Sequence, residues 1–162
     1  MARFTTGIRI ALLTSAVLVF AAALLAQGQL KLNPHLDYSS DSVDGPLITG
    51  NDTQTGVVAG KPNYVMIYGE GCYNSKRQAR RTVALSERYG DKVNFVIIDL
   101  DKPQSPAQLK LVQRYYGGSI PDLVLLDGDG KPVYNQAGEQ SEQALSRILD
   151  SALQQTTAQE RH

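Results

Sequence analysis

The stretch NYVMIYGEGCYNSK, residues 63–76, carries the strongest structural signal in this chain of 162 residues. Its first six residues are a short apolar run that stops at Gly69, which is typical of a buried β-strand. Residues 72–89 then predict a helix, which Gly90 would end. Cys72, the only cysteine of the sequence, therefore lies where a buried strand passes into a helix.

The segments after this stretch continue the alternation of strands and helices. The pattern predicts strands at 93–98, 122–126 and 133–134 and helices at 105–116 and 141–153. Ser105 can cap the first of these two helices, and apolar residues gather on one face of the second. The order β-α-β-α-β-β-α predicts an α/β domain with a central mixed sheet flanked by helices.

Composition excludes several classes of function. The 16 basic and 16 acidic residues balance, so no positive excess can neutralise phosphates, and we expect no nucleic-acid partner. A lone cysteine cannot form an intramolecular disulfide or a thiolate-rich zinc site, so we expect no metal and no other cofactor. His35 lies in a proline-containing segment and His162 ends the chain, which makes a catalytic Cys/His or Ser/His pair improbable.

The N-terminus contains an uncharged apolar run, IALLTSAVLVFAAALLA at residues 10–26, preceded by Arg3 and Arg9. A helix of this length spans roughly 25 Å, slightly less than the ~30 Å hydrocarbon layer. Residues 1–28 therefore predict an N-terminal hydrophobic helix that acts as a signal anchor; a cleaved signal peptide, with the domain secreted, is the alternative. Because the arginines keep the N-terminus in the cytoplasm, both interpretations place the domain outside it, in a periplasm or a lumen.

The remainder of the chain divides into three parts. Residues 29–60 are rich in Asn, Asp, Ser, Gly and Pro and predict a linker, with one short strand at 47–49 or 57–58. Residues 61–155 predict the folded domain, and 156–162 predict a disordered tail.

This order of elements resembles the thioredoxin superfamily over about residues 61–153, with three local matches. The segment YGEGCYNSK at 68–76 occupies the place of the family's Trp-Cys-x-x-Cys-Lys, GSIP at 118–121 that of its cis-proline loop, and Gly138 that of its glycine after the last strand. The segments GKP and DKVNFV, at 60–62 and 91–96, look most like those of membrane-tethered extracytoplasmic members. The resemblance implies a thioredoxin-like fold, with protein thiols or disulfides of the extracytoplasmic space as partners and the membrane bound through residues 10–26.

The resemblance also implies a chemistry for Cys72, from which this chain departs. In the family, the first cysteine lies at a helix N-terminus that favours its thiolate, and the thiolate attacks a substrate disulfide. A second cysteine then releases the product, but here Ser75 holds that position, and a hydroxyl cannot carry out the exchange. Gly71 and Tyr73 also replace family residues beside the thiol, and Met66 lies where many members bury an acid.

Substrate binding in the family depends on the cis-proline loop. A cis bond between Ile120 and Pro121 would bring main-chain groups beside Cys72, where an extended peptide pairs as an added strand. We expect Gly71 and Tyr73 to complete this substrate-binding surface. Lys76, Arg77, Arg80 and Arg81, in the first turns of the helix, are expected to form a solvated basic face.

Three interpretations of Cys72 stay open. It acts as a monothiol oxidoreductase that needs an external resolving thiol, or it holds partners in mixed disulfides, among which we include a Cys72-linked homodimer. In the third, the thiol is inert and the domain is a redox-inactive peptide- or protein-binding module on a thioredoxin scaffold. We favour thiol–disulfide exchange or mixed-disulfide formation.

Overall fold

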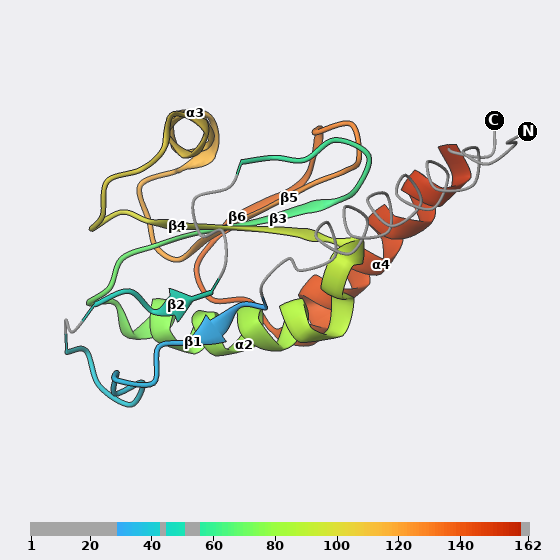
Figure 1. Ribbon diagram of the computed structural model, residues 1–162. Coiled ribbons are helices and arrows are strands. Elements are labelled where there is room, and N and C mark those ends of the chain that lie inside the picture. The colour runs from blue at the N-terminus through green and yellow to red at the C-terminus, as the bar shows by residue number, and fades with distance from the viewer. Residues whose placement is uncertain (1–28, 43–44, 51–55, 160–162) are drawn as a thin grey trace, which may run out of the picture.

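The computed structural model describes residues 29–42, 45–50 and 56–159 (Figure 1). The predicted hydrophobic helix at 10–26 lies outside these residues. Within the described ranges, no helix combines the length and apolar character needed to cross a bilayer.

A four-stranded mixed sheet forms the centre of the domain, in the order β4-β3-β5-β6. Strand β3 pairs in parallel with β4 and antiparallel with β5, which pairs antiparallel with β6. The elements are β3 (Asn63–Tyr68), α2 (Tyr73–Tyr89), a 3₁₀ turn η1 (Gly90–Lys92), β4 (Asn94–Asp99), α3 (Pro106–Tyr115), β5 (Asp122–Leu126), β6 (Pro132–Ala137) and α4 (Glu142–Gln159). The predicted α/β class and element order are confirmed, although α4 continues into the segment predicted to be a disordered tail.

Helices cover both faces of the sheet, with α2 and α4 on one side and α3 on the other (Figure 1). Alternate residues of β3 serve the two sides: Tyr64 and Met66 pack toward α2 and α4, whereas Val65 and Ile67 pack toward α3. All six residues of β3 are buried, which explains why the five residues after Asn63 are an unbroken run of apolar and aromatic side chains.

Contacts between near neighbours fix the start of α3, and a glycine fixes the end of α2. Ser105 and Gln108 form a capping box at the start of α3, in which each side chain bonds the other's backbone N–H, at 3.3 and 3.0 Å. Gly90 follows α2 with a φ of 49°, a conformation that favours glycine.

The segment predicted to be a linker packs against the domain instead. We call its described residues 29–42 and 45–50 the strap. Its two short strands, β1 (Lys31–Leu32) and β2 (Ile48–Thr49), pair antiparallel and lie on the side of α2 (Figure 1). The strand predicted at 47–49 is thus present in part, whereas the alternative at 57–58 forms no strand.

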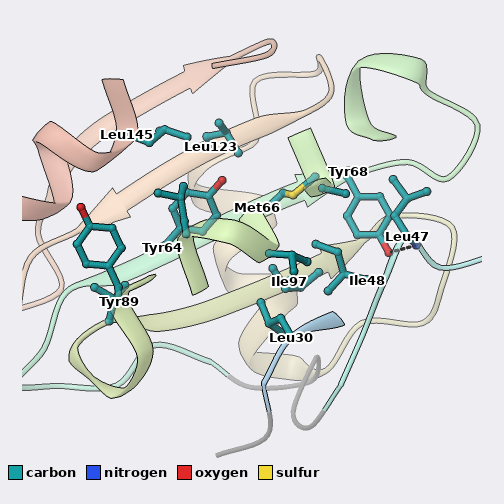
Figure 2. Packing of buried hydrophobic residues seen from close by; sticks show 14 of the residues in the cluster. Leu30, Leu47, Ile48, Tyr64, Met66, Tyr68, Tyr89, Ile97, Leu123 and Leu145 are labelled. Atoms are coloured by element: carbon teal, nitrogen blue, oxygen red, sulfur yellow. Dashed lines mark hydrogen bonds between the residues drawn. The ribbon is translucent and has the colours of Figure 1, made fainter. Parts of the chain in front are cut away.

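Four apolar side chains of the strap enter the main core, namely Leu30, Tyr38, Leu47 and Ile48. Figure 2 shows three of them beside Met66, Tyr68 and Ile97 of the sheet. The hydroxyl of Tyr38 donates to the Leu47 carbonyl at 2.5 Å, and the Leu47 N–H donates to the Tyr68 hydroxyl at 3.1 Å. Leu47 and Ile48 are adjacent, but polar turn residues separate them from the other two, so no sustained periodicity marked the segment as core.

Candidate functional site

Cys72 is the N-cap residue of α2 and is partly exposed with a free thiol. The loop from β3 is tight there, because the Cys72 N–H reaches back to the Gly69 carbonyl at 3.4 Å. No acidic residue lies in the first turn of α2. The first N–H groups of a helix have no intrahelical acceptor, so Cys72 lies beside the free N–H donors and the partly positive end of α2.

The Ile120–Pro121 bond is cis, as the resemblance implies, and its loop lies against the cysteine. Cys72 Sγ is 3.8 Å from the Ile120 carbonyl oxygen and can donate to it. The buried Pro121 in turn accepts a 2.7 Å bond from the N–H of Gly138, whose φ of 91° suits glycine. The three local matches to the family therefore meet in one place.

Ser75 is fully buried one helical turn after Cys72. Residues three apart share a face of a helix, so the serine lies on the side of the cysteine. Its Oγ makes no hydrogen bond to any group in the part of the chain that the structure describes. An unpaired buried hydroxyl is unfavourable by about 1–3 kcal/mol. No local hydrogen bond therefore favours serine at position 75.

Tyr73 is the exposed neighbour of Cys72, with 38% of its surface accessible. The Arg77 guanidinium lies 4.7 Å from the centre of its ring, a cation–π contact. Arg77 and Arg81 both pair with Glu139, each at 2.6 Å. Gly71, the other predicted substrate-binding neighbour, is partly exposed and has no side chain to obstruct access to the thiol.

The expected basic face is wrong at Lys76, whose side chain is fully buried. Its Nζ donates to the carbonyls of Asp37 and Ser42, at 2.8 and 2.7 Å, and lies 3.3 Å from Ser42 Oγ. Because these acceptors belong to the strap, the burial of Lys76 follows from the packing of a segment that its sequence presents as a linker.

Met66 is buried where many family members place an acid. It accepts a contact from the Thr82 hydroxyl at 3.3 Å, and Thr82 also bonds the Tyr64 hydroxyl at 2.8 Å. Burial raises the pKa of Tyr64 to about 12, so this phenol stays protonated at neutral pH. Among the described residues, no carboxyl group takes part in this network.

Sequence reasoning missed a group of charged residues beside the Cys72 loop, which we call the acidic cluster: Glu70, Asp99, Asp101 and Lys102. Glu70 is buried, and its carboxylate pairs with the Lys102 ammonium at 3.1 Å. Desolvation, with a contribution from the charge of Glu70, raises the pKa of Asp99 to about 6, although the Asp101 N–H and the Tyr68 hydroxyl both donate to it. The signal was available, because the carboxyl ends of parallel β3 and β4 meet at one sheet edge.

The described part of the chain holds no group of His, Cys, Asp and Glu side chains arranged to bind a metal ion.

The fold and the site define a thioredoxin-like protein. The chain belongs to the thioredoxin-like domain family, whose sequence model matches residues 51–153.

Two relatives share an activity in their names. The chain is 25% identical over 138 residues to the thiol:disulfide interchange protein TxlA of Synechococcus elongatus, a match that covers 85% of this chain and 71% of the relative. It is 30% identical over 104 residues to the TxlA homolog of Synechocystis. This match covers 64% of this chain and 53% of the relative.

Among solved structures, an uncharacterised thioredoxin-like protein from Clostridium perfringens superposes with a TM-score of 0.50. The match has 21% identity and covers 59% of this chain and 73% of the other. At this identity the likeness shows the fold alone.

Proposed function

We propose that this chain carries out thiol–disulfide exchange on proteins through the single Cys72. The observation that carries the proposal is the position of Cys72 Sγ, at the N-cap of α2 and 3.8 Å from the carbonyl that precedes cis-Pro121. The names of the two curated relatives, both thiol:disulfide interchange proteins, support it.

The exchange proceeds by two displacements, since Ser75 cannot act as a resolving thiol. The Cys72 thiolate attacks one sulfur of a partner disulfide; a Cys72–partner bond forms while the partner's own S–S bond breaks and releases a thiolate. An external thiolate, from a protein or a small thiol, then attacks the partner sulfur of this mixed disulfide. The external thiol leaves joined to the partner, and Cys72 returns as a thiolate.

Substrate recognition uses the surface around the thiol. An extended peptide can pair with the main chain at Ile120, and the cis-Pro121 bond holds that loop against Cys72. Gly71 leaves the approach to the sulfur open, and the exposed Tyr73 ring offers an apolar contact to a substrate side chain.

The proposal includes a membrane anchor at residues 10–26. The uncharged run at 10–26, with Arg3 and Arg9 before it, supports an anchor that leaves the domain outside the cytoplasm. In intact cells of the host, a membrane-impermeant maleimide should label Cys72, and alkaline carbonate should leave the chain in the membrane pellet. A labelled chain in the supernatant would indicate signal cleavage, and a thiol labelled only after lysis would contradict an extracytoplasmic domain.

Covalent partners provide the direct test of the exchange. Affinity-tagged chain isolated from its host after acid quenching should show, on non-reducing gels, species larger than its 17.6 kDa that disappear with reductant. The Cys72→Ser variant, which differs by one atom, should lose these species. Among them, one of twice the chain mass would be the Cys72-linked homodimer.

The opposite result has a clear meaning. If the wild type and Cys72→Ser retain the same partners and reductant changes neither pattern, the domain acts as the redox-inactive binding module and Cys72 carries no exchange.

A further inference from the structure

The loop that presents Cys72 is anchored by a carboxylate outside the family motif, in the turn that follows the adjacent strand β4. We propose that Asp101 is a positioning residue for Cys72, holding residues 69–71 so that the thiol faces the Ile120 carbonyl. This inference rests on the proposed function, because it concerns the reactivity of the same thiol.

Asp101 bonds the loop directly. Its Oδ2 accepts the main-chain N–H of Glu70 at 2.7 Å, two residues before Cys72. Its own N–H donates to Asp99 Oδ1 at 3.0 Å, which ties the carboxylate to the end of β4. Asp101 thus links the end of one parallel strand to the active-site loop that follows its neighbour.

The loop is closely packed between this carboxylate and the cis-proline loop. A Cβ atom added to Gly69 would lie 2.8 Å from Ile120 Cδ1, which would have to move, and 3.4 Å from Asp101 Oδ2, in van der Waals contact, so Gly69 lies between these two side chains. Ile120 provides the carbonyl that contacts Cys72 Sγ, and Gly69 provides the carbonyl that binds the Cys72 N–H. A shift of the Glu70 main chain would therefore change both contacts of Cys72.

The charged groups around the loop give the hydrogen bonds of Asp101 a repulsion to oppose. The carboxyl groups of Glu70, Asp99 and Asp101 lie around this loop, and the Lys102 ammonium pairs with the buried Glu70 alone among them. At neutral pH the repulsion among the carboxylates acts to separate the loop from the end of β4. The N–H bonds to Asp101 and from it to Asp99 oppose that separation, so a neutral acceptor at position 101 should hold the loop as well as the charged one does.

This expectation can be tested with two variants at one position. Asp101→Asn removes the charge and keeps a carbonyl oxygen as acceptor, whereas Asp101→Ala removes both. Asp91→Ala, at an exposed site in η1 before β4, is the control for loss of a surface carboxylate. Because the chain has one cysteine, the neutral disulfide dithiodipyridine reports its rate directly, releasing one pyridine thione for each Cys72–pyridyl disulfide formed.

We expect Asp101→Ala to react on the order of tenfold more slowly than the wild type, because small misplacements of reacting groups carry losses of this size or larger. Asp101→Asn should stay within about twofold of the wild type, as should Asp91→Ala. Amide hydrogen exchange should show the Glu70 N–H protected in the wild type and in Asp101→Asn but unprotected in Asp101→Ala. If Asp101 had a purely structural role, its substitution would lower thermal stability, but Asp101→Ala and Asp101→Asn would not differ in reaction rate and Glu70 N–H protection.

Failure of the inference differs from failure of the proposed function. Equal rates for Asp101→Ala and the wild type, or an equal loss in Asp101→Asn, would overturn the positioning role while leaving a reactive thiol. A wild-type Cys72 that reacts no faster in the native chain than in urea would overturn both.

Discussion

Replacing Ser75 with cysteine is expected to convert the monothiol site into a dithiol site that closes a disulfide with Cys72. Residue 75 is fully buried one turn after Cys72, and its Oγ bonds to no group of the described chain, so a larger sulfur atom breaks no existing hydrogen bond. The Cα atoms of residues three apart on a helix are about 5 Å apart, which is within the Cα–Cα range of a disulfide. Oxidised Ser75→Cys should therefore contain no free thiol, where the wild type contains one.

The Ser75→Cys variant should also reduce protein disulfides faster than the wild type. An intramolecular resolving thiol acts at a high effective concentration, so we expect dithiothreitol-dependent insulin reduction to rise on the order of a hundredfold over the wild type. The covalent partner species of the wild type should become scarce, because the thiol introduced at position 75 would release them. The measurements are a thiol titration after oxidation and the insulin precipitation rate.

Ser86→Cys is the matched control, since Ser86 is also a buried serine of α2. It lies roughly 21 Å along the helix from Cys72, too far for a disulfide within one chain. It should keep two free thiols and wild-type insulin reduction. If Ser75→Cys behaves like this control, the two side chains do not face each other and the comparison with dithiol thioredoxin sites fails.

The parts of the molecule that local sequence patterns specify were predictable. Strand β3 shows itself as an apolar run because both its faces are buried, and Ser105 marks the start of α3 because a cap is a contact between near neighbours. Cys72 and the Ile120–Pro121 bond are far apart in sequence, yet each has a recognisable local context. Their meeting could be inferred from family resemblance but not from either segment alone.

The parts that depend on distant contacts were not predictable in the same way. The strap looks like a linker because its core residues, such as Leu30 and the adjacent Leu47 and Ile48, are too few and too widely separated among polar turn residues to form a sustained pattern. Lys76 looks like a surface lysine because its acceptors, the carbonyls of Asp37 and Ser42, belong to that same segment. Main-chain acceptors leave no trace in residue identity, so no pattern at position 76 could have revealed its burial.

Lys76→Met is expected to destabilise the protein by releasing the strap. Methionine has nearly the length of lysine and fills the same space in α2, but it offers no donor to the strap. The carbonyls of Asp37 and Ser42 would lose a charged partner at 2.8 and 2.7 Å, and bonds to charged groups contribute about 1.5–3 kcal/mol each. Because burial of the ammonium is itself unfavourable, we expect a net loss of about 2–3 kcal/mol in the free energy of unfolding.

The loss should be local before it is global. The strap also holds the sheet through the Leu47 N–H, which bonds the Tyr68 hydroxyl at 3.1 Å, and Tyr68 donates to Asp99 at 3.0 Å. Releasing the strap therefore exposes the acidic cluster to water, which would return the pKa of Asp99 from about 6 toward its ordinary, lower range, because desolvation is its main cause. Hydrogen exchange at Leu47 and NMR titration of Asp99 measure the two effects separately.

Lys110→Met supplies the control, because Lys110 is an exposed lysine of α3. Its stability should stay within about 0.5 kcal/mol of the wild type, and both Leu47 exchange and the Asp99 titration should be unchanged. If Lys76→Met matches this control in urea unfolding, the strap is held by its apolar residues alone. If instead the strap opens while the Asp99 titration stays the same, the acidic cluster is shielded by the sheet and α3, and the strap has no influence on the surroundings of Cys72.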